Sequence, residues 1–171
     1  MVYVKMIRNT SGGTEYIKRL HKYIVIDRLT GEIRKDFVYM SGYGVDCADF
    51  DYAYHQMVMT QEYFGKVGYN PLVHYMVCFD HDVKDKEKAS RLASLIADYF
   101  RNDHQLIWGI HHKPRKSGEY HVHYLVNAVN YRNGKMIHSY KPDVKEFAEY
   151  IYEVTHFRVR YSVMGYEDDL K

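Results

Sequence analysis

The stretch Tyr120-His121-Val122-His123-Tyr124-Leu125-Val126-Asn127 is the most informative part of this sequence for the fold. Successive side chains of a β-strand point to opposite faces of its sheet, so this stretch divides into two sets. The set expected to pack against helices consists of Val122, Tyr124 and Val126. The set expected on an open sheet face consists of His121, His123, Leu125 and Asn127. A sheet face with paired imidazoles and an amide is suited to chemistry.

Four histidines fall within the thirteen residues from His111 to His123. His111 and His112 end a predicted strand over 106–112, and the polar segment 113–119 joins it to the next strand. If the two strands pair as a hairpin, alternation allows only one of these two histidines to share a face with His121 and His123. The pattern predicts a divalent-metal site made of His121, His123 and either His111 or His112, because imidazole is a common metal ligand.

The composition is that of a globular domain. The chain has 171 residues, 46% of them hydrophobic, and a net charge of +2 that does not by itself indicate a nucleic-acid partner. It has no apolar run long enough for a bilayer and no signal-peptide pattern, so no membrane insertion is expected. Two cysteines are too few for a disulfide framework and favour the cytoplasm. The 19 tyrosines either stack on unpaired bases or pack in the core.

The pattern of apolar residues predicts strands mixed with helices, without a regular βαβ rhythm. The expected strands are 2–8, 33–40, 72–79, 106–112, 120–130 and, as a further candidate, 157–164. The expected helices are one from Thr14 through Ile24, one from Asp49 to about Phe64, and 86–101 and 143–154. This order predicts an α+β fold with a central, largely antiparallel five-stranded sheet and helices mainly on one face.

Several motifs together resemble the mobilisation P-type plasmid relaxases, the HUH (His-hydrophobic-His) DNA-nicking enzymes that include the MobA/VirD2-like relaxase domains. Gly109-Ile110-His111-His112, followed by His121-Val122-His123 and Asn127, resembles their third motif. Leu20-His21-Lys22-Tyr23-Ile24 resembles the first motif, and His74 to Phe79 resembles the second. The resemblance implies an HUH-endonuclease-like sheet related to RRM and ferredoxin-like folds. It covers most of the chain, as a single domain over 1–171 that is either complete or the N-terminal part of a longer protein.

Three features depart from the family pattern. Cys78 stands where the family usually has serine, so a weak thiol donor replaces a hydroxyl. Lys113, Pro114 and Arg115 occupy positions where an acidic residue is common. The gap before the His-x-His pair is longer than usual, and the Gly-Ile-His-His context favours His111 over His112 as the third ligand.

The resemblance implies roles for individual residues. Tyr23 is the expected nucleophile, with Tyr16 as the alternative on the same helix face. Alternation places His74 on the open sheet face with Cys78, where it either orients a metal ligand or phosphate or is a hydrogen-bonded structural histidine. The residues expected to contact DNA are Lys22, Arg19, Cys78, Lys113, Arg115 and Asn127. One divalent ion is expected, Mn²⁺ or Mg²⁺ first, with Zn²⁺, Ni²⁺ or Co²⁺ as alternatives.

The implied function is metal-dependent nicking and rejoining of one DNA strand at a conjugative transfer origin through a 5′-phosphotyrosine. The implied partners are single-stranded or hairpin DNA, with accessory relaxosome proteins and a coupling protein as further candidates. A rolling-circle replication initiator shares this chemistry, but there the tyrosine typically follows the histidine motif. A non-catalytic single-stranded DNA-binding domain is the alternative outside enzymes.

Overall fold

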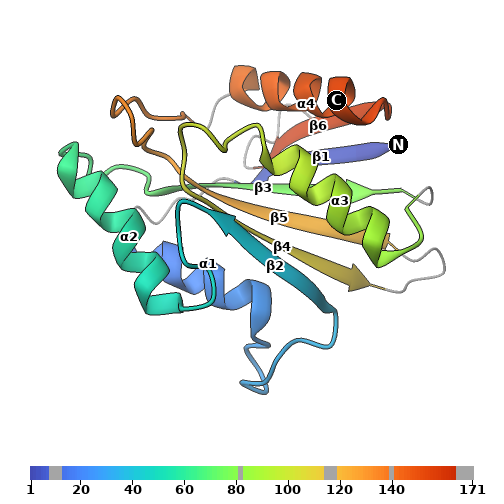
Figure 1. The fold of residues 1–171 in the computed structure, drawn as a ribbon, viewed down its shortest axis with the longest axis horizontal. Helices are drawn as coiled ribbons and strands as arrows, with labels where there is room; N and C mark the ends of the chain where they lie inside the picture. Colours follow the sequence, from blue (N-terminus) through green and yellow to red (C-terminus); the bar gives the residue numbers. More distant parts are fainter. Residues whose placement is uncertain (8–12, 81–82, 114–118, 139–140, 165–171) are drawn as a thin grey trace.

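The computed structural model describes residues 1–7, 13–80, 83–113, 119–138 and 141–164. Its strands and helices alternate irregularly along the chain, as Figure 1 shows. In chain order they are β1 (Val2–Ile7), α1 (Glu15–Val25), β2 (Phe37–Tyr43), α2 (Phe50–Tyr63), β3 (Leu72–Phe79), α3 (Lys86–Ala97), β4 (Leu106–Lys113), β5 (Glu119–Asn127), α4 (Lys141–Thr155) and β6 (Val159–Met164). No helix in the described ranges has both the length and the apolar character needed to cross a membrane.

All six strands belong to one sheet, in the order β2-β4-β5-β3-β1-β6. Every neighbouring pair is antiparallel except β1 with β6, which run parallel. The predicted α+β class and the largely antiparallel sheet are confirmed. The sheet has six strands rather than five, because the candidate strand near the C-terminus pairs with β1 and forms an edge.

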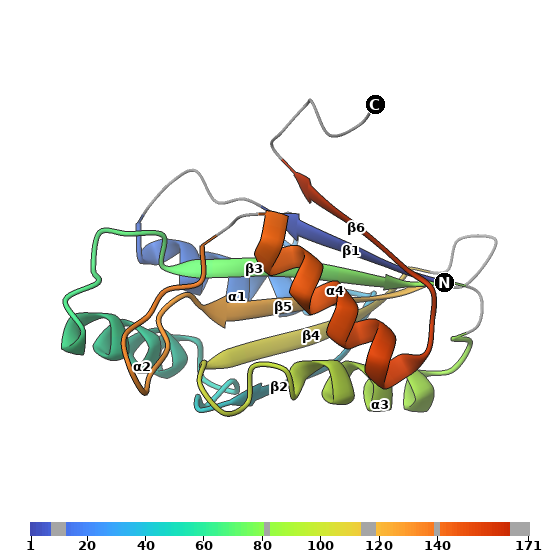
Figure 2. The ribbon, with the colours of Figure 1, turned by 90° about the horizontal axis from the view of Figure 1, so that it is seen from above.

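One face of the sheet carries the larger core, which lies under α3 and α4 (Figure 2). Val122, Tyr124 and Val126 of β5 are buried in it, as the alternation predicted. They meet apolar side chains that α3 and α4 contribute, including Ala93, Ile96, Phe147 and Ile151. Burial of this apolar area is the main source of stability for the layer.

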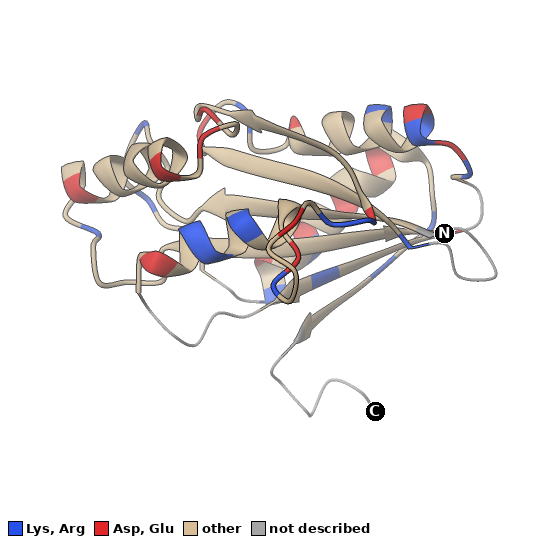
Figure 3. Ribbon diagram, turned by 90° about the horizontal axis from the view of Figure 1, so that it is seen from below, with Lys and Arg blue, Asp and Glu red and all other residues tan. Residues whose placement is uncertain are grey.

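The other face is also covered in part, which corrects the expectation of helices mainly on one face. Ile17 and Ile24 of α1, with Met57 of α2, form a second core with Ile107 and Leu125 of the sheet. Among the described helices, α1 contacts β4 and β5 and shares this core with Leu72 at the start of β3, whereas no helix lies over β1 and β6 on this side (Figure 3). The open face is therefore confined to one half of the sheet.

Local signals in the sequence explain where the elements begin. The Asp49 carboxylate accepts hydrogen bonds from the backbone N–H groups of Asp51 and Tyr52, which caps α2 as its sequence predicted. Strand β2 begins at Phe37 rather than at Ile33 because Ile33 forms a bridge with Ile26 instead. The chain thus makes a short hairpin after α1 before it joins the sheet.

Candidate active site

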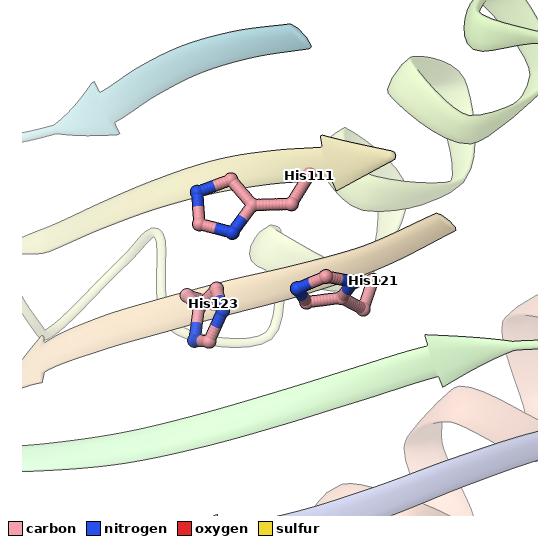
Figure 4. A group of neighbouring side chains, drawn as sticks. All are labelled: His111, His121 and His123. Carbon is pink, nitrogen blue, oxygen red and sulfur yellow. The ribbon is translucent and has the colours of Figure 1, made fainter. Parts of the chain in front are cut away.

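Strands β4 and β5 bring three histidines together. His111 lies directly opposite His121 in the antiparallel register, and His123 lies two residues further along β5 on the same face. All three side chains are buried. One ring nitrogen from each histidine lies within 4.8 Å of the corresponding nitrogens of the other two. Figure 4 shows the three imidazoles grouped over the two strands. This geometry suits three ligands of one divalent ion.

The register also decides between the two candidates for the third ligand. His112 pairs with Tyr120 in the register, and its ring stacks on that tyrosine with 4.3 Å between the ring centroids and 12° between the planes. Alternation therefore places His112 on the face opposite His111. The metal-ligand cluster, defined here as His111, His121 and His123, includes the candidate that the sequence context favoured.

Gly109 allows α1 to approach this cluster. It lies opposite His123 in the register, and a Cβ atom there would collide with Cγ2 of Ile24. With a hydrogen in that place, the last turn of α1 lies directly on β4. One carbonyl of this turn then finds a partner in the sheet: Nε2 of His111 donates a hydrogen bond to the Ile24 carbonyl over 2.6 Å.

The hydrogen bonds leave ring nitrogens available for a metal. Because Nε2 of His111 donates its proton to Ile24, Nδ1 of that ring carries a lone pair. Nδ1 of His111 and Nε2 of His123 are both buried and make no hydrogen bond within the described residues. Burial lowers the pKa of His121 to about 4 and lowers the pKa values of His111 and His123 as well. Neutral imidazoles with unused lone pairs are the form that binds a divalent ion, so these residues fit one.

His74 on β3 lies beside the metal-ligand cluster, where the sequence analysis expected a residue that orients a metal ligand or phosphate. Its Nε2 lies 2.9 Å from Nδ1 of His123, and both rings are buried. If Nδ1 of His123 donates this hydrogen bond, Nε2 of His123 presents its lone pair to the metal. Burial also lowers the pKa of His74 to about 4, so its Nε2 can accept.

Tyr23 lies against the metal-ligand cluster. Its ring centroid is 5.6 Å from that of His123 and 6.3 Å from that of His111, with edge-on geometry in both cases. Tyr16, the alternative nucleophile, packs into the second core between α1 and the sheet, and burial raises the pKa of its phenol. The described part of the chain therefore brings Tyr23, and not Tyr16, to the histidines.

Cations gather on the outer side of α1 (Figure 3). They line a hollow of about 540 Å³ whose walls are Glu15, Lys18, Arg19, Lys22, Tyr23, Ile26 and Arg28. This hollow includes both cations of α1 that the sequence analysis assigned to DNA. Lys113 is exposed at the end of β4, and Arg115 lies outside the described residues. Cys78 pairs with His121 in the register and so lies next to the cluster on the uncovered half of the sheet.

Asn127 does not reach the surface, which corrects its assignment to DNA. It is fully buried, and its Nδ2 donates to the Met57 carbonyl and to Oε1 of Gln105. Its Oδ1 accepts from Nε2 of Gln61 and from the backbone N–H of Val129. The sheet face was predicted correctly, but α2 covers this end of it. Asn127 therefore ties α2 to the sheet.

Two charged residues near the cluster were missed by the sequence analysis. The guanidinium of Arg34 lies 4.9 Å from the ring centroid of Tyr23, and Arg34 forms a two-bond ion pair with Asp36. Both precede β2 in the hairpin segment after α1. The only sequence signal is Arg34-Lys35-Asp36 after the turn at Gly31, which is also typical of an exposed loop.

The nuclease-domain model of the MobA/VirD2-like relaxases matches residues 23–156 of the chain. The match begins at Tyr23 and includes the three clustered histidines. A solved structure described as "Molecular Basis of Vancomycin Resistance Transfer in Staphylococcus aureus" is similar over 97% of this chain and 98% of that chain, with 14% identity and a TM-score of 0.49. A comparison with curated proteins found no match.

The family model covers well over half of the chain, so the protein belongs to the MobA/VirD2-like relaxases and comprises their nuclease domain. It is thus a DNA-nicking enzyme of the HUH type that acts at a transfer origin. The assignment rests on the family model and agrees with the paired histidines on β5.

Proposed function

We propose that this relaxase domain nicks and rejoins one DNA strand through a covalent bond to Tyr23, with one divalent ion held by His111, His121 and His123. The observation that carries the proposal is the edge-on contact of the Tyr23 ring with two of the three histidines. A phenol and a metal-ligand cluster so close together can act on the same phosphate group.

In the proposed reaction, Oη of Tyr23 attacks the phosphorus of the scissile phosphodiester. A bond forms between Oη and phosphorus, the bond from phosphorus to the 3′ oxygen breaks, and that oxygen takes up a proton. The phenolic proton of Tyr23 passes to solvent. The product is a 5′-phosphotyrosine and a free 3′-OH, and the reverse reaction rejoins the strand.

The three histidines would hold the ion, and the ion would act as a Lewis acid on a non-bridging phosphate oxygen. Their own contribution is to stay neutral and correctly oriented near pH 7, which burial and the bonds to Ile24 and His74 support. Mn²⁺ or Mg²⁺ is the proposed ion because both are available in cells, although imidazole ligands give Zn²⁺, Ni²⁺ and Co²⁺ higher affinity.

The proposed DNA surface surrounds the cluster on two sides. Arg19 and Lys22 would contact phosphates from the hollow on α1, and Lys113 would do so from the end of β4. On the uncovered half of the sheet, Cys78 lies between His121 of β5 and Tyr3 of β1, and Lys5 is two residues further along β1. Together these positions support single-stranded or hairpin DNA at a transfer origin as the substrate. The proposed setting is the cytoplasm, with accessory relaxosome proteins and a coupling protein as further proposed partners.

Adduct formation tests the proposal. Labelled single-stranded oligonucleotides tiled from the DNA that flanks the coding sequence are incubated with the protein and Mn²⁺ or Mg²⁺. We expect a denaturant-resistant adduct that EDTA prevents, that Tyr23→Phe loses and that Tyr16→Phe keeps. Mass spectrometry of the digested adduct should find the nucleotide on the peptide that contains Tyr23.

Other outcomes identify the alternatives. An adduct that persists in Tyr23→Phe contradicts the assigned nucleophile. Binding of oligonucleotides without an adduct under any metal favours a single-stranded DNA-binding domain without catalysis. Adduct formation only at a replication origin would favour a rolling-circle initiator.

A further inference from the structure

The last turn of α1 forms hydrogen bonds both with the metal-ligand cluster and with the hairpin that follows the helix. Three of the last four carbonyl groups of this helix accept hydrogen bonds: Lys22 from the N–H of Ile26, Ile24 from His111, and Val25 from the backbone N–H of Arg34 over 2.8 Å. The bridge between Ile26 and Ile33 closes the hairpin that returns the chain to this turn. Arg34 is therefore fixed at its backbone next to Tyr23.

The side chain of Arg34 is fixed as well. Its Nε donates to Oδ1 of Asp36 over 2.9 Å, and its Nη2 donates to Oδ2 over 3.1 Å. The two side chains are only 15% and 18% exposed, respectively. A planar, two-bond pair of this kind restricts the guanidinium far more than a single contact does. Asp36 is itself anchored, because its carbonyl accepts a hydrogen bond from the N–H of His112.

The fixed guanidinium lies over the face of the Tyr23 ring, 4.9 Å from the ring centroid. The same ring makes T-shaped contacts with His111 and His123. The phenol thus has a cation over its face and two imidazoles of the metal-ligand cluster at steep angles to its plane. A cation over an aromatic face is attracted by the negative potential of the ring, so this contact favours the observed orientation of the Tyr23 ring.

The ion pair between Arg34 and Asp36 also reduces the net positive charge next to the metal-ligand cluster. A lone cation next to three metal ligands would repel a divalent ion, whereas the Asp36 carboxylate, bonded to the guanidinium at two points, offsets that charge. The paired carboxylate therefore allows a guanidinium to lie close to the cluster at little cost to metal binding.

We propose that Arg34, held by Asp36, is a positioning residue that orients Tyr23 for attack and does not help to bind the metal. This role rests on the proposed function of Tyr23. It separates two tasks of the site: the histidines bind the ion, and the ion pair between Arg34 and Asp36 holds the nucleophile in line with it.

The test compares Arg34→Ala, Arg34→Lys, Asp36→Asn and a control, Lys35→Ala, whose exposed side chain lies between the pair in sequence. The measured quantities are the single-turnover rate of adduct formation with saturating oligonucleotide and metal, the Kd for Mn²⁺, the Kd for the oligonucleotide and the melting temperature. We expect Arg34→Ala to lower the rate at least tenfold, while the Kd for Mn²⁺ stays equal or falls because Asp36 is left unpaired. Lysine should restore part of the rate, since its ammonium can place a positive charge over the ring but cannot form the planar two-bond pair.

The double variant Arg34→Ala/Asp36→Asn should be no slower than Arg34→Ala, because Asp36 acts through Arg34. If Arg34→Ala does not fold, Arg34→Gln replaces it and keeps a polar side chain. A rate within twofold of wild type overturns the inference, and so does a rate loss that matches an equal loss of Mn²⁺ affinity. If the wild-type protein forms no adduct, the proposed function is wrong. If the wild type forms the adduct and Arg34→Ala forms it at an unchanged rate, only the role of Arg34 is wrong.

Discussion

Nε2 of His74 lies 2.9 Å from Nδ1 of His123, so that β3 and β5 are joined by a hydrogen bond between two buried imidazoles at the edge of the metal-ligand cluster. Many metal-binding histidines have such a partner, which fixes the tautomer and orientation of the ligand ring. Here the partner is itself a histidine, and the supporting bond comes from a neighbouring strand in the same sheet. The arrangement predicts a measurable role for His74 in metal affinity.

We expect His74→Leu to weaken Mn²⁺ binding about 10- to 100-fold, because Nδ1 of His123 loses its acceptor. Isothermal titration calorimetry measures the Kd directly. His74→Gln is the matched control: its side-chain oxygen is as many bonds from Cβ as Nε2 of histidine and can accept the same hydrogen bond. Equal losses in both variants would show that the site needs the imidazole ring for another reason.

The register of β4 and β5 predicts that His111 and His112 behave differently. His111→Ala should abolish the rise in melting temperature that Mn²⁺ causes, because a ligand stabilises the folded state only through the site it binds. His112→Ala should keep that rise, since its ring stacks on Tyr120 on the opposite face. The comparison uses thermal unfolding with Mn²⁺ and with EDTA. A full response in His111→Ala would contradict the assigned ligand set.

Close approach of α1 to the sheet depends on Gly109. We expect Gly109→Ala to reduce the free energy of unfolding by about 1–3 kcal/mol, a typical cost of overpacking, and to slow adduct formation, because Ile24 must move together with the turn that carries Tyr23. Urea unfolding measures the first effect. Ile24→Ala removes the side chain that the new methyl group meets. The double variant should therefore be more stable than the sum of the single effects predicts, and strict additivity would argue against the contact.

Much of this site follows from alternation and pairing alone. The period of two along β5 assigns His121 and His123 to one face, and the short connection to β4 brings a third histidine beside them. The choice between His111 and His112 requires the register of the hairpin, which the sequence leaves open because the length of the turn within 113–119 does not fix it. The Gly-Ile-His-His context pointed to His111, and the observed register agrees with it.

The features that sequence reasoning missed depend on how separate elements pack. Asn127 is on the predicted face, but α2 covers it. Apolar and polar residues are only weakly segregated around α2, so its sequence does not indicate which side of the helix is buried. Arg34 lies in a hairpin whose conformation is set by hydrogen bonds to the end of α1. Neither tertiary contact has a periodic pattern in the sequence.

His21 predicts how the fold responds to acid. Its side chain is fully buried on α1, its Nε2 lies 2.9 Å from the Cys47 carbonyl, and its ring meets Phe50 edge-on. Burial lowers the pKa of His21 to about 4, whereas a histidine in the unfolded chain has a pKa of about 6.5. Between these values the unfolded chain binds more protons than the folded one, so stability falls as the pH falls.

We therefore expect the contribution of His21 to the free energy of unfolding to be nearly independent of pH above about 7.5, where the unfolded chain no longer protonates this residue. It should decrease as the pH falls from about 6.5 to about 4, by up to roughly 3 kcal/mol from this residue. His74 and His121 act in the same direction when no metal is bound, because burial lowers the pKa of each to about 4. Urea unfolding at pH 7.5, 6 and 5 in EDTA measures the decrease. His21→Gln keeps a donor for the Cys47 carbonyl but cannot titrate, so its stability should depend less on pH than that of wild type, and an unchanged slope would contradict the assignment.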